Sequence, residues 1–164
     1  MKRQKGQDIV EFALLLPIFL LVLCGIIYCG FMFGDYQTVQ GIVRNAAREA
    51  AVVEPTKDEI NPTELKYDYH KIKDKYDEIL KNENVITHLY VPDVSGKGGI
   101  QIDLGANLKT VLPDASIPDD SVGAVLTMKL TTSDISFVNY MQNVVGIPEN
   151  YTVSCFMYRE KTSA

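Results

Sequence analysis

The sequence has no charged residue from Phe12 to Phe33. At about 1.5 Å per residue, a helix over this run would extend roughly 33 Å, which is enough to cross the hydrocarbon core of a bilayer. The apolar part of a cleaved secretory signal is shorter, at about 7–15 residues. We therefore expect a helix that spans or anchors in membrane lipid, rather than a buried soluble hairpin or an ordinary signal peptide.

Cysteine and histidine are scarce as well, with three and two residues. Cys24 and Cys29 fall within the apolar run, so Cys155 stands alone in the rest of the chain and cannot build a disulfide framework there. His70 and His88 are not part of a Cys, His and Asp cluster with metal-ligand spacing. We expect no metal site and no cofactor.

Motifs of catalysis and ligand binding are also missing. The glycine-rich stretch Ser95–Gly99 lacks the spacing of a phosphate-binding loop. Asp114, Asp119 and Asp120 lack the alternating ligands and glycine turn of a calcium loop. Asn150–Thr152 matches a glycosylation acceptor, but three-residue matches are frequent by chance. No nucleophile is paired with a base, so we expect no enzyme, and a membrane-tethered hydrolase has no supporting residues.

Basic residues stand before the apolar run, as Lys2, Arg3 and Lys5. Removing these three cations, with the acids Asp8 and Glu11, from totals of 16 basic and 21 acidic residues leaves 13 and 19. Positive flanks stay in the cytoplasm, so we expect a single-pass protein of the cytoplasmic membrane with its C-terminal domain outside. The acidic remainder has no basic stripe, which argues against nucleic acid as a partner.

Helical periodicity continues after the apolar run, in GDYQTVQGIVRNAAREAAVV. Apolar residues recur three or four positions apart on one stripe, while Gln37, Arg44, Arg48 and Glu49 lie off it. The Glu54-Pro55 step then discourages further helix. We expect a helical stem to about Val53, with this stripe: Tyr36, Val39, Val43, Ala46, Ala50 and Val53.

Small residues recur at one-turn spacing along the same predicted helix. Helices in lipid attract each other mainly by close packing, and small side chains let two backbones approach. Glycine is also common in membrane helices without this role. The candidate packing residues are Gly25 with Cys29, Gly30 with Gly34, and Gly41.

The remaining chain predicts an α+β domain. A helix is expected over 61–84, with Asn61 as its cap, Pro62 in its first turn and Leu65, Tyr69, Ile72, Tyr76 and Ile79 on its buried face. Period-two patterns predict strands in VITHLYV, GIQIDLG, VGAVLTMKLTT and YTVSCFMYR. A short helix is expected from Ser133 to about Val145. The antiparallel strands would be covered by the stem and the second helix.

Glu11 lies at the edge of the apolar run, next to Phe12. A carboxylate in hydrocarbon costs on the order of a few kcal/mol, and less near the interface. Glu11 could simply extend to the headgroups, or it could meet a cation. The sequence alone leaves both interpretations open.

Three stretches carry a family resemblance: KGQDIVEFALLLPIFLLVLCGIIYCG at the start, YQTVQGIVRNAAREAA after it, and VSCFMYRE near the end. The combination of N-terminal basic residues, Gly6, Glu11-Phe12, Pro17 and Asn45–Glu49 resembles the TadE-like family. These are small pilin-like proteins of bacterial tight-adherence (Flp-type) pilus systems. The segment from Pro55 to Ser121 offers no family residue.

The resemblance implies a pilin-like fold and cleavage by a prepilin peptidase after Gly6, which would make Gln7 the first mature residue and Glu11 the fifth. Glu11, Phe12 and Pro17 would act in assembly with other pilin-like subunits and the pilus assembly platform. Gln7 and Phe12 depart from the phenylalanine and tyrosine often found at these positions in related pilins. Gln7 could also cyclise after cleavage.

The domain boundaries expected from this resemblance are a leader over 1–6, a transmembrane helix over 7–34, a stem over 35–54 and an extracytoplasmic domain over 55–164. The size of that last domain favours a minor pilin or pseudopilin of a Tad pilus, used in adhesion or secretion at the bacterial surface. The alternative is an uncleaved membrane-anchored extracytoplasmic binding protein.

Overall fold

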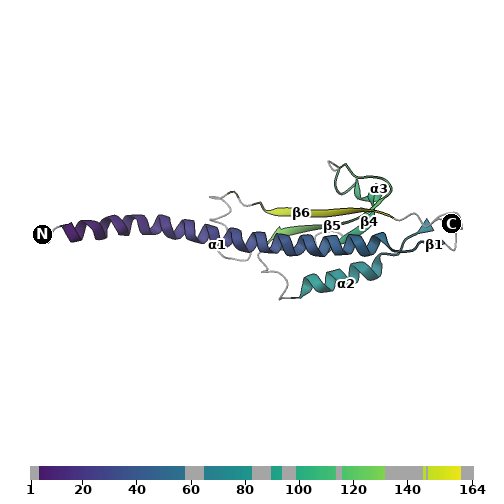
Figure 1. The fold of residues 1–164 in the computed structure, drawn as a ribbon, viewed down its shortest axis with the longest axis horizontal. Coiled ribbons are helices and arrows are strands. Elements are labelled where there is room, and N and C mark those ends of the chain that lie inside the picture. Colours follow the sequence, from purple (N-terminus) through teal and green to yellow (C-terminus); the bar gives the residue numbers. More distant parts are fainter. Residues whose placement is uncertain are drawn as a thin grey trace. The chain divides into compact units, whose positions relative to one another are not determined.

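The computed structural model describes residues 4–57, 65–82, 90–93, 99–113, 116–131, 146 and 148–159, without the side chains of 4–8, 57 and 65. The chain forms two compact units, Met1–Gly34 and Asp35–Ala164, and helix α1 runs through the boundary. The elements are α1 (Gln4–Ala51), β1 (Thr56–Lys57), β2 (Leu65–Lys66), α2 (His70–Lys81), β3 (Tyr90–Pro92), β4 (Gln101–Leu104), α3 (Gly105–Leu108), β5 (Ser121–Leu130) and β6 (Asn150–Tyr158) (Figure 1).

The long apolar helix followed by an antiparallel sheet and further helices confirms the α+β prediction. Strand β5 is the centre of the sheet. Strand β6 pairs along one side of β5 from Ser121 to Lys129. Strands β3 and β4 pair with β5 at Met128–Leu130 and Val122–Val125, so they share its other side.

The two faces of the sheet have different partners. Residues directly opposite one another in an antiparallel pair share a face, and successive residues alternate between faces. Val122 on one face packs with Ala50 of α1 and with Tyr69. Val125, on the other face, packs with Leu108 of α3 and with Ile117. The sheet is therefore covered by helices on both faces at this end.

The stem is the part of α1 from Asp35 to Ala51, within the second unit. Its predicted stripe is confirmed for Val39, Val43, Ala46 and Ala50, which are fully buried, and Ile42 and Ala47 widen it. Arg44 and Arg48 are exposed, as expected for residues off the stripe. The stem contacts the sheet near both of its ends, through Tyr36 with Tyr151 of β6 and Ala50 with Val122 of β5.

Helix α2 begins at His70, later than the sequence pattern predicts. Leu65 and Lys66 form strand β2 instead, which pairs with Thr56 and Lys57 in an antiparallel two-stranded sheet. Thr56 Oγ1 adds a hydrogen bond to the carbonyl oxygen of Lys66. The prediction of helix over 65–69 is wrong: pairing with β1 takes up the backbone of Leu65 and Lys66, and residues 67–69 precede the helix. The Asp68 carboxylate accepts the His70 N–H at 3.0 Å, at the helix start.

The buried face of α2 agrees with the prediction in part. Tyr69 and Tyr76 are buried, Ile72 and Ile79 are half-buried, and Leu80 is buried without having been predicted. The four strands β3 to β6 lie within or next to their predicted segments. The short helix α3 was not predicted. The proposed cap at Asn61 and Pro62, the residues before Tyr90 in the first strand, and the helix over 133–145 lie outside the described residues.

Candidate functional site

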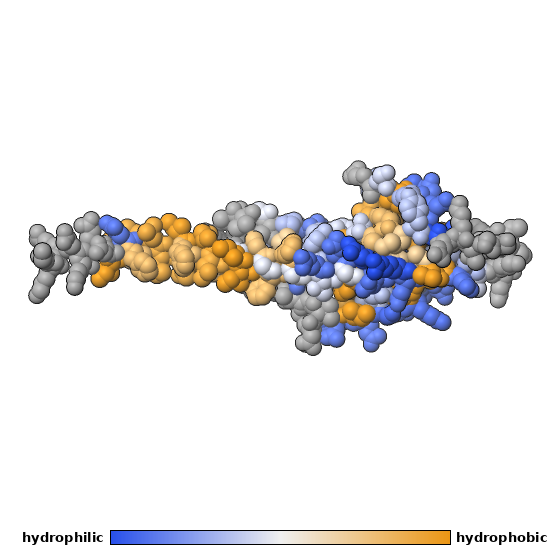
Figure 2. All heavy atoms as spheres, viewed as in Figure 1, coloured by the Kyte–Doolittle hydropathy of each residue, from blue (hydrophilic) through white to orange (hydrophobic). Residues whose placement is uncertain are grey.

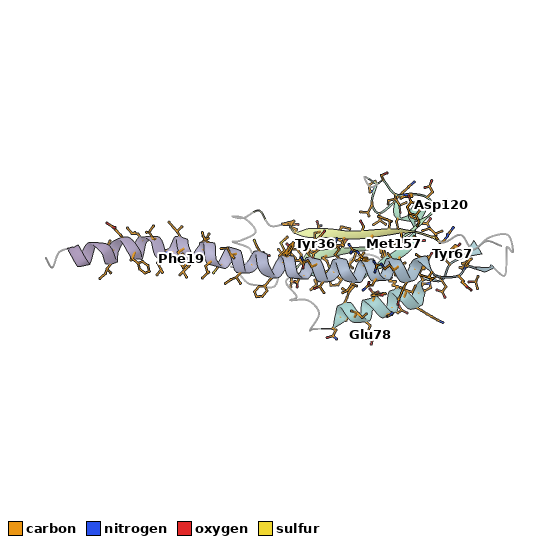
Figure 3. All side chains as sticks on the ribbon, viewed as in Figure 1. Phe19, Tyr36, Tyr67, Glu78, Asp120 and Met157 are labelled. Atoms are coloured by element: carbon orange, nitrogen blue, oxygen red, sulfur yellow. The ribbon has the colours of Figure 1, made fainter. Side chains whose placement is uncertain are left out.

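The apolar part of α1 exposes most of its side chains, although Tyr28 is buried. Phe12 is 67% exposed, Phe19 63% and Phe33 62%. Figure 2 shows this part as a continuous hydrophobic surface, and in Figure 3 Phe19 projects outward from it. Among the described residues, α1 is the one helix long and apolar enough to cross a membrane. So much exposed apolar surface is unusual in water and is the expected surface of a helix in lipid.

Three residues from the predicted assembly group lie in this part of α1. Glu11 is exposed at the start of the apolar surface, and Phe12 beside it is exposed too. Pro17 lies inside the helix. Proline has no N–H, so the carbonyl of Ala13 one turn earlier loses its usual partner. The structure therefore places a local weakness in the backbone close to Glu11.

The predicted leader and cleavage site are described only in part. Lys2 and Arg3 lie outside the described residues. Lys5, Gly6 and Gln7 belong to the backbone of α1, and their side chains are not described. The roles of these five residues in orientation and cleavage remain predictions.

The predicted packing residues differ in how far they are exposed. Cys29, Gly30, Gly34 and Gly41 are exposed, whereas Gly25 is half-buried. A Cβ added to Gly30, Gly34 or Gly41 would meet nothing within 4 Å. Gly30 and Gly34 are four residues apart and so lie on the same face of α1. This face is smooth and open at both positions, and its role in packing is still a prediction.

The second unit contains a cavity of about 590 Å³, at the end of the sheet where β4 and α3 lie. Its described lining comes from the start of α2, from β4, and from α3 and the turn after it. The lining residues are Tyr67, Tyr69, His70, Lys73, Gln101, Ile102, Asp103, Ala106, Asn107, Leu108, Thr110 and Val111. The sequence offered no motif for this site because its residues come from two segments that are far apart along the chain.

Hydrogen bonds fix the α3 wall of the cavity. Asp103 Oδ1 accepts the N–H of Leu104 at 2.7 Å and a side-chain N–H of Asn107 at 2.9 Å. Thr110 Oγ1 donates to the carbonyl oxygen of Asn107 at 2.7 Å. These bonds hold the carboxylate and the amide in one orientation, so the polar groups of this wall are preorganised.

Three side chains of the second unit have pKa values that their surroundings raise. A hydrogen bond to Glu49 of the stem raises the pKa of Lys75 on α2. Burial raises the pKa of Tyr69 to about 12. Burial, followed by the charge of Asp35, raises the pKa of Tyr151 to about 12. A deprotonated tyrosine loses hydration when it is buried, so the neutral form is favoured at both positions.

Other candidate residues are not gathered into a site. Among the described residues, no group of three His, Cys, Asp or Glu side chains could hold a metal ion. Asp119 forms an ion pair with Lys109, and Gly99 adjoins Asp77 of α2. His88 and Asp114 lie outside the described residues. His70 is exposed at the start of α2, where it lines the cavity.

Together, the fold and the exposed helix define an α+β protein with one apolar helix of membrane-spanning length. Residues 6–48 match the family model described as TadE-like protein. This match confirms the predicted resemblance over the N-terminal part of the chain. No curated protein and no solved structure matches the chain. The family match ends inside the stem, so it says nothing about the cavity.

Proposed function

We propose that this protein is a minor pilin or pseudopilin, a structural subunit in the assembly of a Tad (Flp-type) pilus. The observation that carries the proposal is the TadE-like match over residues 6–48, which includes Gly6, Glu11 and Pro17. The exposed apolar surface of α1 supports it, because a subunit of this kind is anchored in the membrane until it is assembled.

In this proposal, a prepilin peptidase removes residues 1–6 at the cytoplasmic face of the membrane. Helix α1 begins at Gln4, so the peptidase must unwind its first turn to reach the Gly6–Gln7 bond. Glycine destabilises a helix by roughly 0.5–1 kcal/mol relative to alanine and leaves the peptide bond unobstructed. Gly6 therefore suits a site that must be both helical in the membrane and accessible to a protease.

Cleavage would create a new α-amino group at Gln7, at the end of an apolar helix. Glu11 of a neighbouring subunit can approach this cation, and the low dielectric of the surroundings strengthens their attraction. Removing one partner would leave the other charge buried without compensation, which is strongly unfavourable. The ion pair would set the axial register between subunits.

Helix packing would supply the remaining contacts between neighbouring subunits. Gly30 and Gly34 have open space where a side chain would be, so another helix can approach the α1 backbone closely. The outer unit, Asp35–Ala164, is large for a subunit whose role is to repeat along a fibre. We therefore place the protein at a minor position, as a subunit that starts or caps the pilus.

The mass of the N-terminus tests the cleavage step. We expect that cells with an active prepilin peptidase yield a chain that begins at Gln7, and that cells with an inactive peptidase retain residues 1–6. Gly6→Val should retain the leader even with the active enzyme. Retention of the leader by the wild-type chain in peptidase-active cells would contradict the proposal. The same spectrum shows whether Gln7 has lost ammonia by cyclisation, which would remove the proposed amine.

A pair of alanine variants tests the role of Glu11. Glu11→Ala should still be cleaved and inserted, but its recovery with other pilin-like subunits after mild crosslinking should fall at least about tenfold, because the register-setting charge is lost. Asp8→Ala removes an acid one turn earlier and serves as the matched control, with recovery close to wild type. Equal recovery of both variants would exclude the proposed pairing.

The alternative function is an uncleaved, membrane-anchored binding protein. The observation that favours it is the cavity of about 590 Å³ in the outer unit, since most ligand sites lie in cavities of this size. The N-terminal mass separates the two functions, because the alternative requires residues 1–6 to stay attached.

A further inference from the structure

Strand β4 is an edge strand that runs beside the cavity. It pairs with β5 along one of its edges, and β6 pairs with the opposite side of β5, so the other edge of β4 faces away from these strands. Within the described part of the chain, no strand pairs with the outer edge of β4. Gln101, Ile102 and Asp103 of β4 all line the cavity, so the cavity follows this open edge.

Two backbone N–H groups along this edge donate hydrogen bonds to carboxylates of the same chain. The Asp77 carboxylate accepts the Ile100 N–H at 2.8 Å, and the Asp103 carboxylate accepts the Leu104 N–H at 2.7 Å. In an antiparallel ladder, alternate residues direct their N–H and C=O groups to opposite edges. Because Leu104 directs its N–H away from β5, Ile102 two residues earlier does so as well.

The N–H of Ile102 therefore lies between the N–H groups of Ile100 and Leu104, both of which donate to carboxylates. The hydrogen bonds recorded among the described residues include none from its N–H to a side chain or to another loop. Its side chain packs against the core cluster of Ala50, Tyr69 and Val122, which holds this part of β4 in place. An unpaired N–H and C=O on a fixed strand edge form a template for one more strand.

The walls on either side of this edge differ in chemistry. On the α2 side lie His70 and Lys73, next to the positive end of the helix dipole. On the α3 side, Ala106 and Val111 present apolar groups beside the polar side chains of Asp103, Asn107 and Thr110, and Val111 is 42% exposed. An extended chain placed between them would direct alternate side chains toward Lys73 on one wall and toward Val111 on the other.

We propose that the outer unit binds an extended peptide segment of a partner protein along the open edge of β4. The peptide backbone pairs with the N–H and C=O of Ile102, an acidic peptide side chain faces Lys73, and an aliphatic side chain contacts Val111. This is strand addition to a sheet edge, in which the main chain supplies affinity and alternate side chains supply specificity. The inference is independent of the proposed role in a pilus.

The lining favours a peptide over a saccharide. Tyr69 is 92% buried, since only 8% of its surface is exposed, and it stacks on Tyr67 with ring centroids 6.1 Å apart. Arg159 covers the Tyr67 ring at 4.6 Å from its centroid (Tyr67 is labelled in Figure 3). These aromatic faces are already in contact with other groups, so they offer no open platform for a sugar ring. Among the described residues, by contrast, no group pairs with the outward N–H of Ile102.

Binding to the full chain in detergent micelles tests the proposal, with fluorescent acetyl-Val-Glu-Val-Glu-Val-amide as the probe. We expect saturable binding that is lost when alternate amides of the probe are N-methylated, because such a peptide cannot pair with a strand edge. Lys73→Glu should weaken binding at least about tenfold, since it places like charges together. Lys71→Glu, an exposed position on α2 outside the cavity, is the matched control and should bind as the wild type does.

The expected signature in hydrogen exchange is slower exchange of the Ile102 N–H when the probe is bound. Far-UV circular dichroism of each variant checks that the fold is retained. The proposal is overturned if the wild-type chain does not bind the probe, if the N-methylated probe binds equally well, or if Lys73→Glu and Lys71→Glu bind alike. Binding of galactose or glucuronic acid with displacement of the probe would instead identify a saccharide site.

Discussion

Gly99 lies just before β4, where its backbone comes close to the side chain of Asp77 in α2. Its φ angle is +89°, and a Cβ added there would lie 2.2 Å from Asp77 Oδ1. The same carboxylate accepts the N–H of Ile100 at 2.8 Å. The sequence showed a glycine-rich connection here, but it could not show that Asp77, more than twenty residues earlier, sets the space available.

Gly99→Ala should lower the free energy of unfolding of the second unit by about 2–4 kcal/mol, because left-handed strain adds to the loss of the Asp77–Ile100 hydrogen bond. Gly146→Ala is the matched control. Gly146 also has a positive φ of +71°, but a Cβ there would meet nothing within 4 Å. Its expected cost is about 1–2 kcal/mol. Urea unfolding in detergent measures both, and equal losses would show that the Asp77 contact contributes nothing.

At the scale of single elements, the stem of α1 and helix α2 show what periodicity can and cannot predict. The stripe of Val39, Val43, Ala46 and Ala50 is buried as predicted, because its spacing fits one helical face. The helical spacing of Leu65 and Tyr69 fits a helix equally well. That prediction is wrong at Leu65 because pairing with β1 satisfies its backbone instead.

Val43→Ala tests the packing of the stem against the rest of the second unit. Val43 is fully buried, so losing two methyl groups and leaving a cavity should cost roughly 1.5–3 kcal/mol. Arg44→Ala, at the neighbouring exposed position, should change the free energy of unfolding by less than about 0.5 kcal/mol. Thermal unfolding followed by circular dichroism gives both values. A loss at Arg44 as large as that at Val43 would contradict the assigned face.

For the whole molecule, charge at the N-terminus and the apolar helix decide the predicted orientation. Protease added to intact spheroplasts should digest the second unit of the wild-type chain, which is expected to lie outside the cytoplasm. Replacing Lys2, Arg3 and Lys5 together by glutamine should make a substantial fraction of the chains resistant, since the positive residues that stay in the cytoplasm are gone.

The matched control for this experiment replaces three exposed cations of the second unit by glutamine, namely Lys71, Lys81 and Lys129. It changes the net charge by the same amount without altering the flank of the apolar helix. Its digestion should match that of the wild type. Resistance of the wild-type chain itself would place the second unit on the cytoplasmic side.

The sequence by itself determined the elements whose physical cause is local. The length and apolarity of α1, the buried stripe of the stem and the period-two strands β4, β5 and β6 follow from side chains close together along the chain, and so does the TadE-like resemblance. Only the tertiary structure decided which strand edge stays open. The cavity at Ile102 requires β5 to be shared by three strands and requires α2 and α3 to lie on either side of β4. Those are contacts between residues far apart in sequence, and no local pattern encodes them.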